Sequence, residues 1–167
     1  PFMLMCHHKA PHDDFEYHSR YEHLFDDVEI PEPDSLWEDK GHRSIGSREY
    51  GTTVSEKNTR RNAVKTMSSS NYPTAALKLD GLDATGRTKA AYQKYLKDYM
   101  RVVKGINDSV GRLLDYLDRE GLTENTVVIY TSDQGMFLGE HDYIDKRWIY
   151  EEALQMPFLI RYPGEIK

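Results

Sequence analysis

Two adjacent side chains, Asp133 and Gln134, follow a short apolar run and precede Gly135. A carboxylate beside an amide oxygen suits a hard divalent cation, Ca²⁺ in first place and Mg²⁺ in second, because these cations take oxygen ligands. The single cysteine, Cys6, excludes an internal disulfide and every zinc motif built from several cysteines. The alternative to a metal site is an Asx turn that ends a strand, and spacing alone leaves that alternative open.

A second polar group contains His7, His8 and His12 and follows the apolar residues 2–6. A histidine at such a position could donate a hydrogen bond to an anion or protonate a leaving oxygen. The alternative for His7 and His8 is that they cap and cover the end of a strand. For His12, the alternative is an exposed loop histidine.

The charged segment 139–147 supplies a third group. Lys146 could neutralise an anionic substrate as a point charge, whereas the alternative is an ordinary solvated lysine. His141 lies in the same segment and is a candidate for contact with substrate.

The elements that must position these residues follow from the apolar pattern. Apolar residues recur at spacings of three and four from Thr88 to Glu120, which predicts a long amphipathic helix that stops at Gly121. Apolar runs at 2–6, 126–131 and 157–162 predict strands, and all three have the character of buried strands. A second helical stretch is expected from Arg147 to Ala153.

This alternation of strands and helices predicts an α/β fold with a mostly parallel sheet flanked by helices. Ligands bind beyond the carboxyl ends of the strands in such sheets, which is where the three polar groups stand. Residues 13–87 have no sustained period and contain a Gly/Ser/Thr/Asn-rich stretch. We interpret them as a functional excursion with short local elements, including a helical turn or two between Phe15 and Phe25.

Composition excludes several classes of protein. The chain has 167 residues, a net charge of -6 and 38% hydrophobic residues, so a single folded domain is expected. No run approaches the roughly 20 apolar residues of a membrane-spanning helix. The acidic balance also argues against a nucleic-acid partner, whose binding surface needs clustered Lys and Arg.

The order of these pieces resembles the formylglycine-dependent sulfatases of the alkaline phosphatase-like superfamily. The resemblance rests on Ala10-Pro11-His12, Tyr130-Thr131-Ser132-Asp133-Gln134-Gly135, Asp145-Lys146-Arg147 and Tyr150-Glu151. The resemblance covers residues 1–12 and about 88–167. Within the family, the chain is most similar to bacterial carbohydrate sulfatases related to N-acetylglucosamine-6-sulfatase.

The resemblance implies a role for each matching residue. Asp133 and Gln134 match two Ca²⁺ ligands, although many relatives have Asn where this chain has Gln134. His12 matches the histidine that contacts the sulfate and protonates the leaving alcohol, and Lys146 matches the lysine that binds a sulfate oxygen. His141 is expected to bind substrate. The implied substrate is a sulfated glycan or a small sulfate ester, and the implied location is periplasmic, extracellular or lysosomal.

The formylglycine motif, Cys/Ser-x-Pro-x-Arg, does not occur in the sequence. We therefore expect a partial catalytic domain over 1–167, with the nucleophile and further metal ligands upstream and with no activity in the isolated chain. It would comprise a strand and histidine loop (1–12), the excursion (13–87), and a helix, metal-site strand, lysine loop and final strand (88–167). The alternatives are a phosphatase or phosphodiesterase of the same superfamily, and a non-catalytic glycan-binding or structural fragment.

Overall fold

The computed structural model describes residues 1–58 and 60–166, and its dominant element is the helix α3, Ala84–Arg119. Asp83 caps the first turn by accepting a hydrogen bond from the Gly86 amide at 2.8 Å. Gly121 follows the helix with φ of 65°, a left-handed conformation that glycine adopts without strain. The periodicity therefore predicted this helix and its end correctly and placed its start too late.

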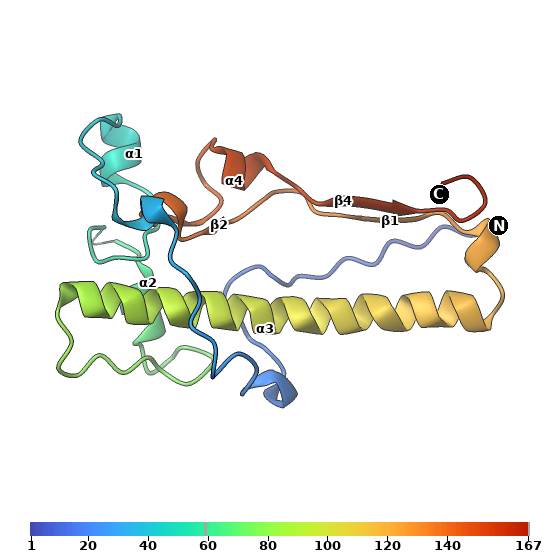
Figure 1. Cartoon of the computed structure of the whole chain (residues 1–167), viewed down its shortest axis with the longest axis horizontal. Helices are drawn as coiled ribbons and strands as arrows, with labels where there is room; N and C mark the ends of the chain where they lie inside the picture. The colour runs from blue at the N-terminus through green and yellow to red at the C-terminus, as the bar shows by residue number, and fades with distance from the viewer. Residues whose placement is uncertain (59, 167) are drawn as a thin grey trace.

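Short elements surround α3. The helical elements before it are η1 Ser19–Tyr21, η2 Asp34–Trp37, α1 Ile45–Glu49 and α2 Ala63–Met67. The elements after it are η3 Thr123–Asn125, β1 Val128–Thr131, β2 Phe137–Leu138, η4 Glu140–Asp142, β3 Ile144–Asp145, α4 Glu151–Leu154 and β4 Phe158–Arg161. The irregular region 13–87 thus contains short local helices, which lie near the first half of α3 (Figure 1).

The strand pairs are antiparallel. β1 pairs with β4, so that Val128 lies opposite Arg161 and Thr131 opposite Phe158, and β2 pairs with β3. The α/β class is confirmed, but both described sheets are antiparallel, whereas the sequence predicted a mostly parallel sheet. The physical reason is the connection, which turns back through the β2–β3 hairpin and α4 and lacks the crossover that parallel neighbours require.

The first apolar run, residues 2–6, does not form the strand that the sequence predicted. Residues 2–6 are exposed, and in the described part of the chain they pair with no strand. The 126–131 and 157–162 strands form as β1 and β4, but both are largely exposed instead of buried. An apolar run favours burial only where another element covers it, and none of the described residues covers these runs.

The core lies around the first half of α3. Its helix face contributes Ala91, Tyr92, Tyr95, Leu96 and Val102, and the other buried members are Phe15, Leu36, Val54, Ala63, Val64, Met67 and Tyr72. A smaller cluster of Phe137, Tyr143 and Ala153 packs against Trp148 and Tyr150. We call the part built on these two clusters the body.

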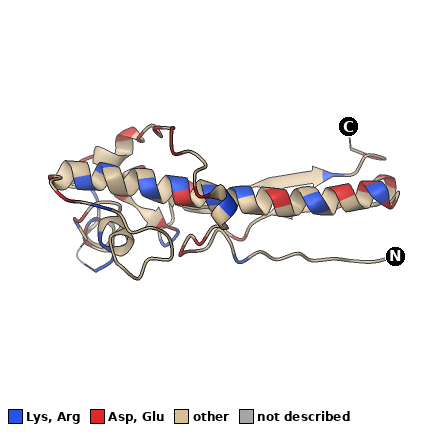
Figure 2. Cartoon of the chain, turned by 90° about the horizontal axis from the view of Figure 1, so that it is seen from below, with Lys and Arg blue, Asp and Glu red and all other residues tan. Residues whose placement is uncertain are grey.

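We call a second part of the chain the arm and define it as residues 2–6, β1, β4 and α3 from residue 107 onward. Figure 1 shows β1 and β4 running along the second half of α3, with both termini at this end. Figure 2 shows acidic and basic residues mixed along α3, whereas the N-terminal trace is nearly uncharged. Among the described residues, no helix combines the length and the apolar character needed to cross a membrane.

Candidate functional site

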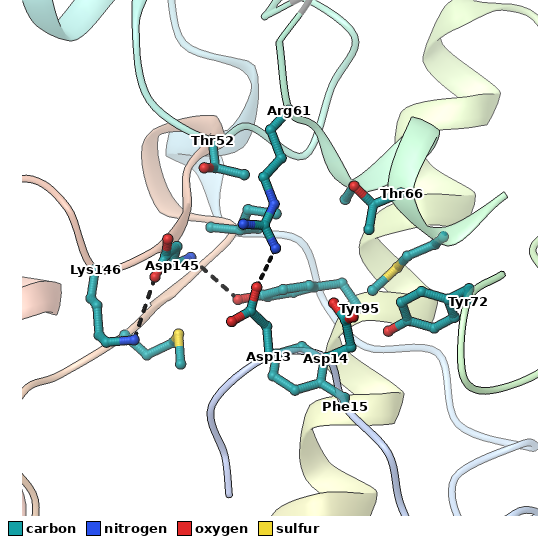
Figure 3. A pocket seen from close by; sticks show the side chains of 14 residues that line it. Asp13, Asp14, Phe15, Thr52, Arg61, Thr66, Tyr72, Tyr95, Asp145 and Lys146 are labelled. Atoms are coloured by element: carbon teal, nitrogen blue, oxygen red, sulfur yellow. Dashed lines mark hydrogen bonds and ion pairs between the residues drawn. The ribbon is translucent and has the colours of Figure 1, made fainter. Parts of the chain in front are cut away.

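A small cavity in the body is lined by one of the candidate residues, Lys146, and by Asp13, the neighbour of His12. Its volume is about 40 Å³, enough for a few waters or one small anionic group. The lining comes from the N-terminal loop, the loop around Thr52, α2, α3 and β3: Asp13, Asp14, Phe15, Thr52, Arg61, Ala63, Thr66, Met67, Tyr72, Tyr95, Met136, Ile144, Asp145 and Lys146. Figure 3 shows carboxylate, guanidinium and ammonium groups around an otherwise apolar interior.

The β2–β3 hairpin brings Lys146 to this cavity. Its turn contains Gly139 at φ of 110°, where the Tyr92 ring lies too close for a β-carbon. The turn is held by Asp142, a buried carboxylate that accepts hydrogen bonds from Lys40 Nζ at 2.9 Å and from the Ser55 hydroxyl at 2.6 Å. Because all these partners are buried, the hairpin is a rigid support for the residues that follow it.

Lys146 is half-buried and carries a cation at the cavity wall. Its Nζ lies 3.5 Å from Asp145 Oδ1, while Asp145 Oδ2 accepts a hydrogen bond from Arg147 Nε at 2.6 Å. The long contact to Asp145 is weaker than a well-formed ion pair. Lys146 therefore retains hydrogen-bonding capacity for an anion, as a point charge with three donors.

Tyr95 places a neutral hydroxyl at the base of the site. Burial raises the pKa of Tyr95 far above its ordinary value. The hydroxyl donates to the Phe137 carbonyl at 3.1 Å and lies 3.5 Å from the Asp145 amide. Tyr95 thus links α3 to both strands of the hairpin and fixes the backbone beside Lys146.

His12 does not line the cavity, but its neighbour Asp13 does. The His12 side chain is exposed, and its Nδ1 lies 2.7 Å from Asp13 Oδ1 and 3.0 Å from the Asp13 carbonyl. Asp13 Oδ2 also forms an ion pair with Arg61 Nη2, drawn as a dashed line in Figure 3. Asp13 and Arg61 line the same cavity as Lys146, and His12 contacts this lining only through Asp13. The roles of His12 and Lys146 in the reaction stay predictions.

Asp133 and Gln134 lie apart from the cavity lining. Both are exposed immediately after β1, and the Ser132 hydroxyl donates to the Gln134 carbonyl at 2.8 Å across the turn. Gly135 then contacts the Glu152 carbonyl so closely that any β-carbon would clash. The donor set fits a hard cation, but the described residues add no group of three or more His, Cys, Asp or Glu side chains to it.

His141 is held in a different cluster. Its Nδ1 lies 2.8 Å from Arg43 Nη2 and 3.0 Å from Glu38 Oε1, and its Nε2 is 3.7 Å from Glu152 Oε1. The Tyr150 ring lies 4.9 Å away. Burial, followed by the Arg43 guanidinium, lowers the pKa of His141 from its ordinary value. His141 is not part of the cavity lining, and its contact with substrate stays a prediction.

Sequence reasoning missed four cavity residues. Asp13 had a usable signal, because it adjoins His12, and Asp145 stood beside Lys146. Tyr95 was recognised only as an apolar helix position. Arg61 had no signal, since it lies in the region without a sustained period and reaches the site only through the fold.

The fold and the cavity together define a class of protein. An α/β structure that places a lysine and an arginine at one small cavity, with a histidine beside the lining, is suited to binding an oxyanion ester. The chain also superimposes on a solved structure described as a complex with its substrate, D-glucosamine-2-N,6-O-disulfate, with a TM-score of 0.78 and 29% identity. That match covers 95% of this chain and 38% of the other, and it assigns the chain to the alkaline phosphatase-like fold.

The model of the sulfatase family matches residues 1–167, and the chain belongs to this family. Among curated relatives, the N-acetylglucosamine-6-O-sulfatase of Bacteroides thetaiotaomicron is 33% identical over 196 residues, covering 100% of this chain and 35% of the relative. The ulvan-active sulfatase of Formosa agariphila is 35% identical over 78 residues, covering 46% of this chain and 15% of the relative. The chain thus spans about a third, or less, of the length of these relatives.

Proposed function

We propose that this chain is part of an enzyme that hydrolyses a sulfate ester on a carbohydrate, with a 6-sulfated glucosamine as the first substrate to test. The observation that carries the proposal is a cavity lined by Lys146 and by Asp13, whose carboxylate contacts His12, in a member of the sulfatase family. The substrate class is supported by the relative named N-acetylglucosamine-6-O-sulfatase and by the solved complex with a disulfated glucosamine.

Each residue has a physical task in the proposed reaction. Lys146 binds a sulfate oxygen and stabilises the negative charge that grows on the sulfate as the ester bond breaks. His12 donates a hydrogen bond to the leaving oxygen and supplies its proton. Asp145 and Tyr95 hold the backbone and the charge beside Lys146 in place.

Two groups of the proposed enzyme are not part of the structure. Asp133 and Gln134 would supply two oxygen ligands to a Ca²⁺ ion, whose charge would stabilise the sulfate oxygens, and the remaining ligands of its usual six to eight must come from other residues. A formylglycine would supply the oxygen nucleophile. The printed sequence has no Cys/Ser-x-Pro-x-Arg motif, so that residue must come from outside it.

The direct test uses the complete enzyme that contains this chain, purified with Ca²⁺. We expect it to release inorganic sulfate from glucosamine 6-sulfate and to release phosphate from glucosamine 6-phosphate far more slowly. A preference for the phosphate ester would contradict the proposal and favour the phosphatase alternative. Binding of the sulfated sugar without turnover of either ester would instead favour a glycan-binding role.

A further inference from the structure

We propose that Asp13 is a positioning residue, anchored by Arg61, that holds the His12 imidazole so that its Nε2 faces the leaving oxygen of the ester. This inference deepens the proposed function and rests on it. It concerns a contact chain of three side chains, from Arg61 through Asp13 to His12, at the edge of the cavity that Lys146 lines.

The hydrogen on the His12 ring can be located from its neighbours. Nδ1 lies within hydrogen-bond distance of the Asp13 carboxylate at 2.7 Å and of the Asp13 carbonyl at 3.0 Å. Both neighbours are acceptors only, so Nδ1 must be the donor and must carry the hydrogen. In the part of the chain that the structure describes, His12 Nε2 has no hydrogen-bond partner, which leaves it for substrate.

This arrangement suits the transfer of a proton from His12. When the sulfur–oxygen bond breaks, the alcohol oxygen leaves with the bonding electron pair and takes the proton from Nε2, while the sulfuryl group passes to the oxygen nucleophile. His12 must begin as the imidazolium ion, with hydrogens on both ring nitrogens, and the carboxylate at Nδ1 stabilises that cation. A carboxylate that fixes the tautomer and orientation of a histidine has the same effect in the Ser-His-Asp triad.

Arg61 gives the pair its position. Its guanidinium binds Asp13 Oδ2, the oxygen opposite to the one that contacts His12. Arg61 directly precedes Asn62, which caps α2 and forms a bridge with Thr53, so the Arg61 backbone belongs to the body. The carboxylate of Asp13 is therefore held from one side by the body and presents its other side to His12.

The chain offers a matched control for this cluster. Asp26 also joins a histidine to an arginine, with His23 Nδ1 at 3.0 Å and Arg101 Nη2 at 2.6 Å from its carboxylate. This second cluster does not contribute to the cavity lining. Asp26→Ala therefore removes the same kind of contacts at a place where the proposal assigns no part in the reaction.

The experiment measures turnover and the His12 tautomer in the complete enzyme. With glucosamine 6-sulfate as substrate, Asp13→Ala is expected to lower kcat about 10–100-fold with a much smaller change in KM, by analogy with the partners that orient metal-bound histidines. Asp26→Ala should leave both constants near those of the wild type. In a His12→Gln background, Asp13→Ala should cost little further activity, because Asp13 acts through His12.

Nitrogen-15 NMR of histidine-labelled enzyme provides a readout that does not depend on activity. The wild type should show the Nδ1–H form of neutral His12, and Asp13→Ala should lower its population while Asp26→Ala preserves it. Equal kcat in the two alanine variants, or an unchanged His12 tautomer in Asp13→Ala, would overturn the inference. If the wild-type enzyme released no sulfate, the proposed function itself would fail, and the tautomer would still report on the contact.

Discussion

The body and the arm treat apolar residues in opposite ways. In the body, Phe137 is completely buried and packs against Tyr143 and Tyr150, whereas Phe158 of β4 is 65% exposed. The body also pairs a buried charge, because the Asp98 carboxylate binds both Lys94 and Arg101. The body therefore buries its main apolar clusters and pairs Asp98 with residues of this chain, although Arg43 Nη1 and Trp148 Nε1 are buried without a hydrogen-bond partner among the described residues. The arm has strand patterning without covering side chains.

The same contrast separates the two kinds of candidate residue. Lys146, Asp13 and Arg61 belong to the body, where several elements fix their positions. Asp133 and Gln134 follow β1 in the arm and remain exposed. The cavity is thus organised by this chain alone, whereas the proposed metal site depends on ligands from elsewhere.

The largest expected effect concerns the metal-site pair. In the complete enzyme, Asp133→Ala should reduce sulfate release by more than about 1,000-fold, because losing a carboxylate ligand weakens binding of a cation that supplies several kcal/mol of charge stabilisation. Bound calcium, measured by elemental analysis after dialysis, should fall in parallel. Full calcium content and wild-type turnover in this variant would show that Asp133 is only a turn residue.

The next effect concerns the cavity lysine. Lys146→Ala should lower kcat/KM for glucosamine 6-sulfate by about 100- to 1,000-fold, the range for removing one donor to a developing negative charge. Calcium content should stay at the wild-type level, because Lys146 contributes no oxygen ligand. A loss of calcium equal to that of Asp133→Ala would mean that the two regions are not separable as we describe.

A matched pair of phenylalanine substitutions compares packing in the two regions. In the 167-residue chain, Phe137→Ala should lower the free energy of unfolding by about 3–5 kcal/mol, because it leaves a cavity in a closed cluster. Phe158→Ala should cost less than about 1 kcal/mol, since its side chain is already exposed. Urea denaturation measures both values, and equal losses would refute the contrast between body and arm.

The smallest effect is the pH dependence due to His141. Its folded pKa lies below the ordinary value of 6.5, so the unfolded chain takes up the proton first. Stability is therefore full above about pH 6.5 and is lost as the pH falls toward the lowered folded pKa. His141→Gln should reduce the drop in Tm between pH 7.5 and 5.5 by less than about 3 °C. An identical or larger drop in the variant would contradict this direction.

The sequence predicted local structure better than it predicted partners. The long helix follows from the spacing of residues such as Tyr92, Tyr95 and Val102, and β1 and β4 follow from their β-branched and apolar runs. The pairing direction could not be predicted, because it depends on how the chain returns through the β2–β3 hairpin. The exposure of residues 2–6 could not be predicted either, because composition does not say which element covers a run.

For the candidate site as well, the sequence indicated single residues and not the contacts between them. Motifs singled out both Lys146 and His12, but only Lys146 lines the cavity, and the roles of both residues stay predictions. Arg61 was missed because its contact with Asp13 joins residues far apart in the sequence, through a region without periodicity. The environment of His141, between Glu38, Arg43 and Glu152, likewise depends on tertiary contacts that no local pattern encodes.

The central claim is that the cavity beside Lys146 receives the sulfate group of the substrate. The most direct measurement is a crystal structure of the complete enzyme, inactivated by Asp133→Ala and soaked with glucosamine 6-sulfate. We expect a sulfate oxygen within hydrogen-bond distance of Lys146 Nζ and the ester oxygen near His12 Nε2. A sulfate group bound elsewhere, with Lys146 in contact only with Asp145, would contradict it.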